Sequence, residues 1–196
     1  MNAESHAPVA RSLRVTFYWA EVSGYMAACW RALSKRPGID LHVVYPQKLW
    51  GKTNPFLADP RLLEGISSEM FISDAPDIDR WLVNSAASRE PHIVVVCGWL
   101  FHPYNRLVKS GKLNNARVVL GMDSPWRGTL GQRLAKFRLA GLVNKLDAVV
   151  TSGERSSEYA RRIGVPERRI RSGYYGFDHD LFSAVACRRP QGTKDW

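Results

Sequence analysis

The chain has 196 residues, of which 45% are hydrophobic and 23% charged, a composition that excludes global disorder and suits one well-buried domain. Its three cysteines (Cys29, Cys97 and Cys187) have no CxxC spacing, which excludes a disulfide framework or thiolate metal cage and indicates a reducing compartment. The net charge of +10 lies in the second half of the chain. Residues 1–98 hold equal numbers of basic and acidic residues, whereas residues 99–196 hold 18 Lys and Arg against 8 Asp and Glu.

The N-terminal segment, residues 1–12, is polar and lacks the apolar stretch of a secretory signal. No apolar run in the sequence approaches the ~18 residues that span a bilayer. We therefore expect a cytoplasmic protein whose residues 1–12 are disordered.

Five short segments rich in valine and other β-branched residues are bounded by Gly, Pro or Asp. They are Leu13–Trp19, Leu41–Tyr45, His92–Cys97, Arg117–Met122 and Ala148–Thr151. Such runs are typical of parallel strands buried on both faces, and the stretches between them can hold crossover helices. The pattern predicts a Rossmann-like, doubly wound, mostly parallel α/β sheet over residues 13–183.

Four stretches between the strands have helical spacing. They are Gly24–Lys35, Asp77–Ser88, Gln132–Leu146 and Glu154–Ile163. In the last of them, Thr151 and Glu154 predict a capping box, and Gly164 ends the helix. Segment Pro46–Met70, rich in Pro and Gly, is expected to be a long loop, with a short strand near Met70–Ile72.

Ligands of an open parallel sheet bind at the carboxyl ends of its strands. After the first strand come Trp19, Glu21, Ser23 and Gly24. A glycine at a helix start lets the backbone approach an anion, and free N–H groups there favour phosphate, although a plain tight turn is the alternative. The absence of a GxGxxG or Walker motif argues against binding of a whole dinucleotide or ATP.

The strand His92–Cys97 is followed by a cluster of aromatic residues, Trp99, Phe101 and Tyr104, together with His102. Aromatic rings at a strand end suit packing against a sugar face or a planar ligand. The alternative is an aromatic cluster that caps a helix, with His102 bonded to its own loop.

Asp123 follows the next strand and is the one acid among eight basic residues between Arg106 and Arg138. That field would hold Asp123 ionised and ready to accept a hydroxyl proton. Asp123 could equally be the N-cap of a helix beginning near Trp126. Arg127 is a candidate for phosphate recognition, with a solvated surface position as the alternative.

The helix Gln132–Leu146 carries four basic residues among its apolar ones, and such a helix can lie on a membrane. The basic residues do not gather on one side, however, and the apolar face shifts between the two halves of the helix. The pattern does not favour a membrane helix, although a peripheral contact at the inner face of the membrane stays open.

The segment Thr151–Phe182 resembles glycosyltransferase family four, whose members have the two-domain GT-B fold. In that family a helix ending in LGVP leads to a short strand and a G(x)nD(xx)F pattern, to which Gly164, Gly173, Asp178 and Phe182 correspond. The resemblance implies that Gly173 and Gly176 turn the backbone towards a cleft and that Phe182 anchors a linker in a domain face.

The resemblance also implies that this chain is the N-terminal, acceptor-binding half of a retaining glycosyltransferase, with residues 184–196 as the linker to an absent C-terminal donor domain. Ser23 and Gly24 would lie beneath the donor diphosphate, and Asp123 or His102 near the reacting acceptor hydroxyl. The candidates for acceptor contacts are Trp19, Glu21, Trp99, Tyr104, Trp126 and Arg127. The donor would be a nucleotide sugar, and the acceptor a glycan or a lipid-linked molecule.

No cofactor or metal is expected, because helix N-termini and basic side chains can stabilise the leaving diphosphate and no carboxylate cluster appears. Without its donor domain the chain should be inactive. The main alternative is a basic α/β binding module for nucleic acid or anionic lipid, but no nucleic-acid signature is present, so we expect no nucleic acid. A stand-alone enzyme with a flavodoxin-like sheet would need a phosphate-cradling loop after the first strand, which is lacking.

Overall fold

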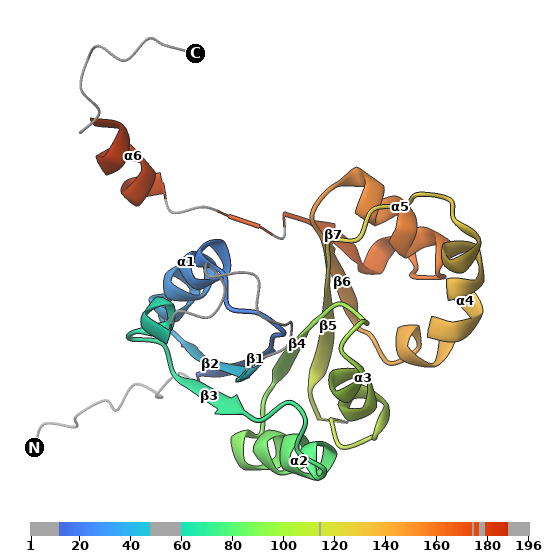
Figure 1. Cartoon of the computed structure of the whole chain (residues 1–196), viewed down its shortest axis with the longest axis horizontal. Coiled ribbons are helices and arrows are strands. Elements are labelled where there is room, and N and C mark those ends of the chain that lie inside the picture. Colours follow the sequence, from blue (N-terminus) through green and yellow to red (C-terminus); the bar gives the residue numbers. More distant parts are fainter. Residues whose placement is uncertain (1–11, 48–59, 114, 174, 177–178, 188–196) are drawn as a thin grey trace, which may run out of the picture.

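The computed structural model describes residues 12–47, 60–113, 115–173, 175–176 and 179–187. In this part of the chain seven parallel strands form one sheet in the order β3-β2-β1-β4-β5-β6-β7 (Figure 1). The strands are β1 Leu13–Tyr18, β2 Ile39–Pro46, β3 Ser68–Phe71, β4 Ile93–Cys97, β5 Arg117–Met122, β6 Ala148–Thr151 and β7 Ile170–Ser172. The predicted Rossmann-like, doubly wound α/β fold is confirmed.

The strands pair in the register that their apolar residues favour. Val15 of β1 lies beside Leu41 of β2 and Ile93 of β4, and these three side chains pack into the same core on one face of the sheet. The strand expected near Met70–Ile72 is β3, two residues earlier, and it pairs with the end of β2. Of the expected loop Pro46–Met70, residues 48–59 lie outside the described part.

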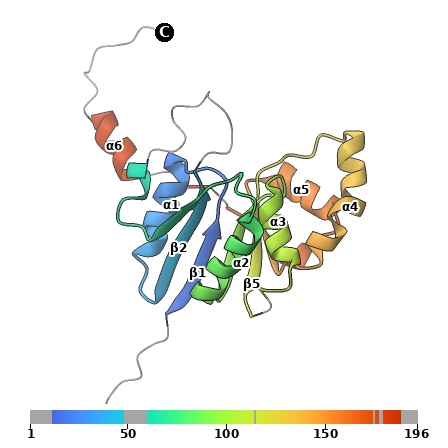
Figure 2. The same ribbon diagram turned by 60° about the horizontal axis from the view of Figure 1, so that its bottom comes forward.

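Six helices and two 3₁₀ turns complete the described chain. They are α1 Gly24–Ser34, η1 Pro60–Leu63, α2 Ile78–Arg89, α3 His102–Lys109, α4 Leu130–Val143, α5 Glu154–Arg162, η2 Glu167–Arg169 and α6 His179–Cys187. Figure 2 shows α2 and α3 in front of the strands and α4 at the far right. The sequence interpretation did not include α3, because its eight residues show little more than two turns of periodicity.

Two apolar cores lie on opposite faces of the sheet. Helices α2 to α5 cover the larger one, in which Leu82 and Leu142 are fully buried against the strands. On the other face α1 and η1 form the smaller core around Trp30. Beyond α1, Val95 and Val119 line an apolar hollow of about 200 Å³ on this second face.

The two predicted caps are wrong. Helix α5 has Gly153 as its N-cap without a side-chain bond, because the buried Thr151 hydroxyl instead contacts that of Ser157 at 2.7 Å. Asp123 does not begin a helix near Trp126, since α4 starts at Leu130 with Thr129 as its N-cap.

The carboxyl-terminal helix α6 stands away from the sheet in both views (Figures 1 and 2). Phe182 on this helix is 61% exposed, and its expected role as the anchor of the linker stays a prediction. Residues 184–187 of the expected linker belong to α6. Residues 1–11 and 188–196, and Asp178 of the family pattern, lie outside the described residues.

Within the described ranges, no helix has both the length and the apolar character needed to cross a membrane.

Candidate functional site

A pocket of about 300 Å³ lies at the carboxyl edge of the sheet, where β1, β4 and β5 end. We name it the rim pocket. Because all strands are parallel, the loops that follow them meet at this one edge. Its lining includes Trp19, Glu21 and Ser23 after β1, Trp99 after β4, Asp123 after β5, and Tyr175.

Five of the ten residues proposed from the sequence therefore line one pocket, although they lie up to about a hundred positions apart in the chain. Trp19 mainly supports the wall of the pocket, because its side chain is only 6% exposed and its ring packs edge-on to Trp30 at 5.9 Å. Trp99 is half-buried, and its ring packs edge-on against Tyr159 of α5 at 5.2 Å. The rim pocket thus has a rigid aromatic wall.

Asp123 is tied to a residue that the sequence interpretation did not single out. The Tyr175 hydroxyl donates a hydrogen bond to Asp123 Oδ2 at 2.9 Å. Burial, together with this bond to the carboxylate, raises the pKa of Tyr175 well above its usual value, so the phenol keeps its proton. The Tyr175 ring also packs edge-on to Tyr25 of α1 at 4.9 Å, which fixes the orientation of the carboxylate.

Ser23 sits at the amino end of α1 as its N-cap but makes no side-chain capping bond. Its Oγ is buried and has no hydrogen-bond partner among the described atoms. Next to it, a Cβ on Gly24 would meet no atom within 4 Å, so the backbone there is open to a ligand. A buried hydroxyl without a partner is costly, which makes this helix end a candidate contact point for a polar group.

Cys97 also lines the rim pocket, but not as a nucleophile. Burial raises the pKa of its thiol to about 12, with the carboxylates of Asp123 and Glu21 adding to the effect. The Cys97 Sγ accepts a hydrogen bond from the backbone N–H of Ala20 at 3.0 Å. The neutral thiol therefore holds the end of β1 against β4.

The charge of the rim pocket contrasts with that of the whole chain. Glu21 and Asp123 are its charged lining residues, and none of the described residues that line it is Lys or Arg. Aromatic walls with carboxylates and hydroxyls suit a neutral ligand rich in hydroxyl groups, because carboxylates accept strong hydrogen bonds from hydroxyls and rings pack on C–H faces. An anionic ligand would meet repulsion there.

His102 and Tyr104 are among the proposed residues that do not line the rim pocket. His102 is exposed at the first position of α3 and does not line it, so the expected place of His102 beside the reacting hydroxyl is not supported. Tyr104 is fully buried, and its hydroxyl donates to the carbonyl of Trp19 at 3.1 Å. Its expected contact with an acceptor is wrong, because the side chain is part of the core.

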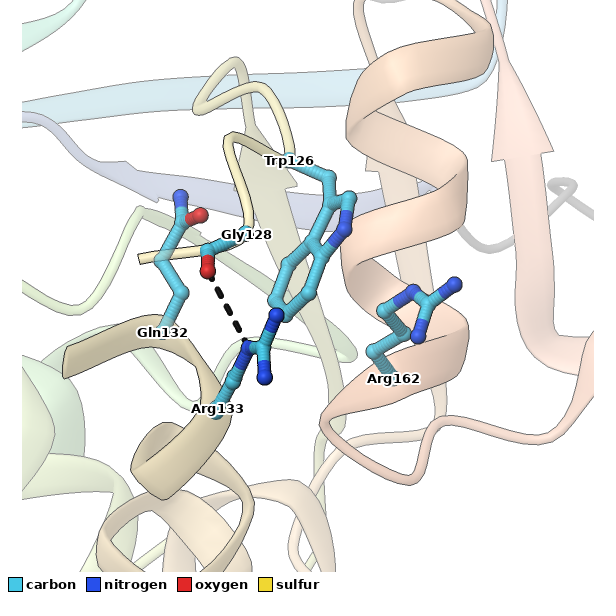
Figure 3. A pocket seen from close by; sticks show the side chains of 5 residues that line it. All are labelled: Trp126, Gly128, Gln132, Arg133 and Arg162. Carbon is cyan, nitrogen blue, oxygen red and sulfur yellow. Dashed lines mark hydrogen bonds between the residues drawn. The ribbon is translucent and has the colours of Figure 1, made fainter. Parts of the chain in front are cut away.

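Trp126 lies in a different hollow of about 520 Å³, which we name the arginine hollow (Figure 3). The guanidinium of Arg162 lies 4.8 Å from the centre of the Trp126 ring, and Arg133 lines the opposite side. Arg127 is exposed nearby, and its backbone N–H donates to the Gln132 side chain at 2.7 Å. The sequence interpretation grouped these residues with Asp123, but the structure separates the basic hollow from the acidic rim pocket.

Tyr175 and Tyr25 were missed by the sequence interpretation. Tyr175 follows β7, so the rule that strand ends meet at one edge could have pointed to it. For Tyr25, at the second position of α1, the sequence carries no comparable signal. Among the described residues no group of three or more His, Cys, Asp or Glu is placed to hold a metal ion.

No protein-family model matches the sequence, and no curated protein matches it. Solved structures do match the fold. UDP-GlcNAc 2-epimerase from Neisseria meningitidis, bound to UDP-GlcNAc, aligns with a TM-score of 0.59 and 12% identity over 82% of this chain and 45% of that one. HepE from Anabaena, in complex with UDP-glucose, aligns with a TM-score of 0.57 and 14% identity over 87% and 46%.

The lipopolysaccharide outer core galactosyltransferase WaaB, in its apo form, aligns with a TM-score of 0.54 and 10% identity over 81% of this chain and 44% of its own. This chain thus spans less than half the length of each of the three. At such identities the likeness shows the fold, which is the Rossmann-like α/β fold found in these GT-B proteins.

Proposed function

We propose that residues 13–183 form the N-terminal, acceptor-binding half of a retaining glycosyltransferase of family-four type. The observation that carries the proposal is the rim pocket, in which Asp123, Glu21 and Trp99 face one space and no described lining residue is a lysine or arginine. The similar structures support it, since two of them were solved with a UDP-sugar and a third is a galactosyltransferase. Each is also about twice as long as this chain.

The proposed acceptor is a neutral sugar hydroxyl, presented by a glycan or a lipid-linked sugar. Trp99 packs against the sugar ring, and Asp123, oriented by Tyr175, accepts the hydrogen bond of the reacting hydroxyl. The bond from the anomeric carbon to the donor diphosphate breaks, the acceptor oxygen bonds to that carbon on the same face, which retains its configuration, and Asp123 takes the hydroxyl proton.

The donor in this proposal is a nucleotide sugar held mainly by a second domain. Ser23 and the amino end of α1 are the part of this chain that would meet the diphosphate, since Ser23 Oγ has no partner among the described atoms. The described residues of the rim pocket offer no cationic side chain opposite the leaving diphosphate, so the second domain must supply most of that positive charge.

Binding of neutral glycosides to the chain tests the proposal. We expect a panel of oligosaccharides and glycosides, titrated by calorimetry, to include ligands whose Kd rises about tenfold in Asp123→Asn and in Glu21→Gln, because each change removes a charged hydrogen-bond acceptor. Glu64→Gln is the matched control, since Glu64 is exposed and does not line the pocket. Glycoside binding that is equal in all three variants would overturn the proposal.

A further inference from the structure

Helix α4 presents an apolar stripe to solvent. Leu130, Leu134 and Phe137 are 78%, 58% and 77% exposed, and their spacing of four and three residues puts them on one side of the helix. Three large apolar side chains on one helix face are unusual on a surface that meets only water.

The opposite side of α4 is the one that packs on the sheet, through Ala135, Leu142 and Val143. The helix therefore has two apolar faces, an outer one in its first half and an inner one in its second. This arrangement is why the apolar face shifts along the sequence. Burial in the domain core explains the inner face but not the apolar stripe.

Basic side chains flank the apolar stripe. Arg133 and Lys136 lie on one side of it and Arg138 on the other, and all three are exposed. Helix α4 contains no Asp or Glu. The nearby acids of α5 are already paired, with Glu158 bonded to Arg162 at 2.6 Å. The positive charge around the stripe is thus largely uncompensated.

The arginine hollow continues this surface, because Arg133 belongs to both (Figure 3). Its Nε donates to the carbonyl of Gly128 at 3.1 Å, which holds the guanidinium at the edge of the hollow. Trp126 lies between Arg133 and Arg162 and offers an amphipathic ring. This set matches a phosphodiester, because Arg133 supplies a cation for the phosphate and the indole suits the boundary between polar and apolar regions.

We propose that this face of α4 binds the surface of a bilayer rich in anionic phospholipid. Leu130, Leu134 and Phe137 enter the boundary between headgroups and acyl chains, while Arg133, Lys136 and Arg138 contact lipid phosphates. A second copy of the chain fits less well, because a two-fold contact through the stripe would bring these cations against their own copies. The inference goes beyond the proposed sugar transfer and does not depend on it.

Cosedimentation of the whole chain with vesicles tests the surface. We expect binding to phosphatidylcholine vesicles that contain phosphatidylglycerol, and little to phosphatidylcholine alone. Phe137→Ser should lower the partition coefficient about tenfold, because a buried phenylalanine is lost from the interface. Arg133→Gln and Arg138→Gln should each lower it about fivefold, and added salt should weaken binding.

Matched controls lie far from α4. Met70→Ser removes an apolar side chain that is 51% exposed on the edge strand β3, and Lys35→Gln removes an exposed cation beyond the end of α1. Neither should change vesicle binding, and thermal unfolding confirms that each variant is folded. The proposal fails if Phe137→Ser binds like the wild type. It also fails if Phe137→Ser abolishes a dimer in solution, or if an oligonucleotide binds better than vesicles and needs Arg133 but not Phe137.

Discussion

His42 lies in β2 with 3% of its side chain exposed, in a place where the strand pattern predicts an apolar residue. Its Nδ1 is 2.9 Å from the Ser67 hydroxyl, and its Nε2 is 3.7 Å from a carboxylate oxygen of Glu69. Burial lowers the pKa of His42, and Arg89 lowers it further. Together they outweigh Glu69 and Asp40, which favour the protonated ring.

This lowered pKa predicts a loss of stability in mild acid. The unfolded chain takes up a proton near pH 6.5, whereas folded His42 does so only at lower pH, so the free energy of unfolding falls as pH drops from about 6.5 through the lowered pKa. His42→Asn keeps a polar partner for Ser67 but does not titrate, and we expect it to flatten that part of the pH profile. Chemical denaturation at a series of pH values measures the effect.

The matched control is His102→Asn, because that ring is exposed at the start of α3. It should leave the slope of the wild-type profile unchanged. Parallel profiles for the wild type and His42→Asn would show that the buried ring does not couple to folding.

At the scale of single elements, two glycines of the α4–α5 region have opposite roles. Gly131 lies inside α4, where an added Cβ would meet nothing within 4 Å. Gly164 follows α5 with φ +101, a conformation that L side chains rarely adopt. Glycine is thus required at the end of α5 but not within α4.

We expect Gly131→Ala to raise the free energy of unfolding by about 0.5–1 kcal/mol, because alanine restricts the unfolded chain and favours helix. Gly164→Ala should lower it by about 1–2 kcal/mol, since the new side chain is strained. Urea denaturation of the wild type and of each single variant measures the two changes in the free energy of unfolding. Equal effects of the two changes would contradict the conformational argument.

The length of the apolar pattern explains which helices the sequence predicted and which it missed. The sequence placed α1, α2 and α5 to within one residue at each end, and α4 to within two residues at its start and three at its end, because each has about three turns of apolar spacing or a clear stop. Helix α3 is short, and its aromatic residues were interpreted as ligand contacts. Whether Tyr104 points into the core or into a pocket depends on α2 and α3 packing together, which no local pattern encodes.

For the molecule as a whole, charge is divided between two regions. The rim pocket is lined by Glu21 and Asp123 without a cation among its described residues, whereas the arginine hollow and the outer face of α4 are basic. The +10 net charge therefore does not act at the proposed acceptor site. The positive charge instead favours binding of an anionic surface beside that site.

This division predicts that residues 1–196 alone transfer no sugar. A leaving diphosphate develops negative charge, and none of the described residues that line the rim pocket is a lysine or arginine that could stabilise it. Incubation with a panel of nucleotide sugars and the glycosides that bind best, followed by mass spectrometry, should show no product above the uncatalysed rate. Turnover by this chain alone would contradict the assignment of donor chemistry to a second domain.

The fold class was predictable from the sequence because β-branched runs alternate with helical spacing, and a parallel sheet follows from that order with few alternatives. The same reasoning brought Trp19, Ser23, Trp99 and Asp123 to one edge, since parallel strands end together. Local order along the chain thus determined the sheet and the rim on which ligand-facing loops gather.

Only the tertiary structure decided which side chains on that rim are available. It buried Tyr104, turned His102 outward, joined Tyr175 to Asp123, and separated Trp126 and its arginines into another hollow. It also turned Phe137 outward from a helix whose other face is buried. The physical reason is that exposure and pairing depend on contacts between residues far apart in sequence, and these contacts exist only once the layers have packed.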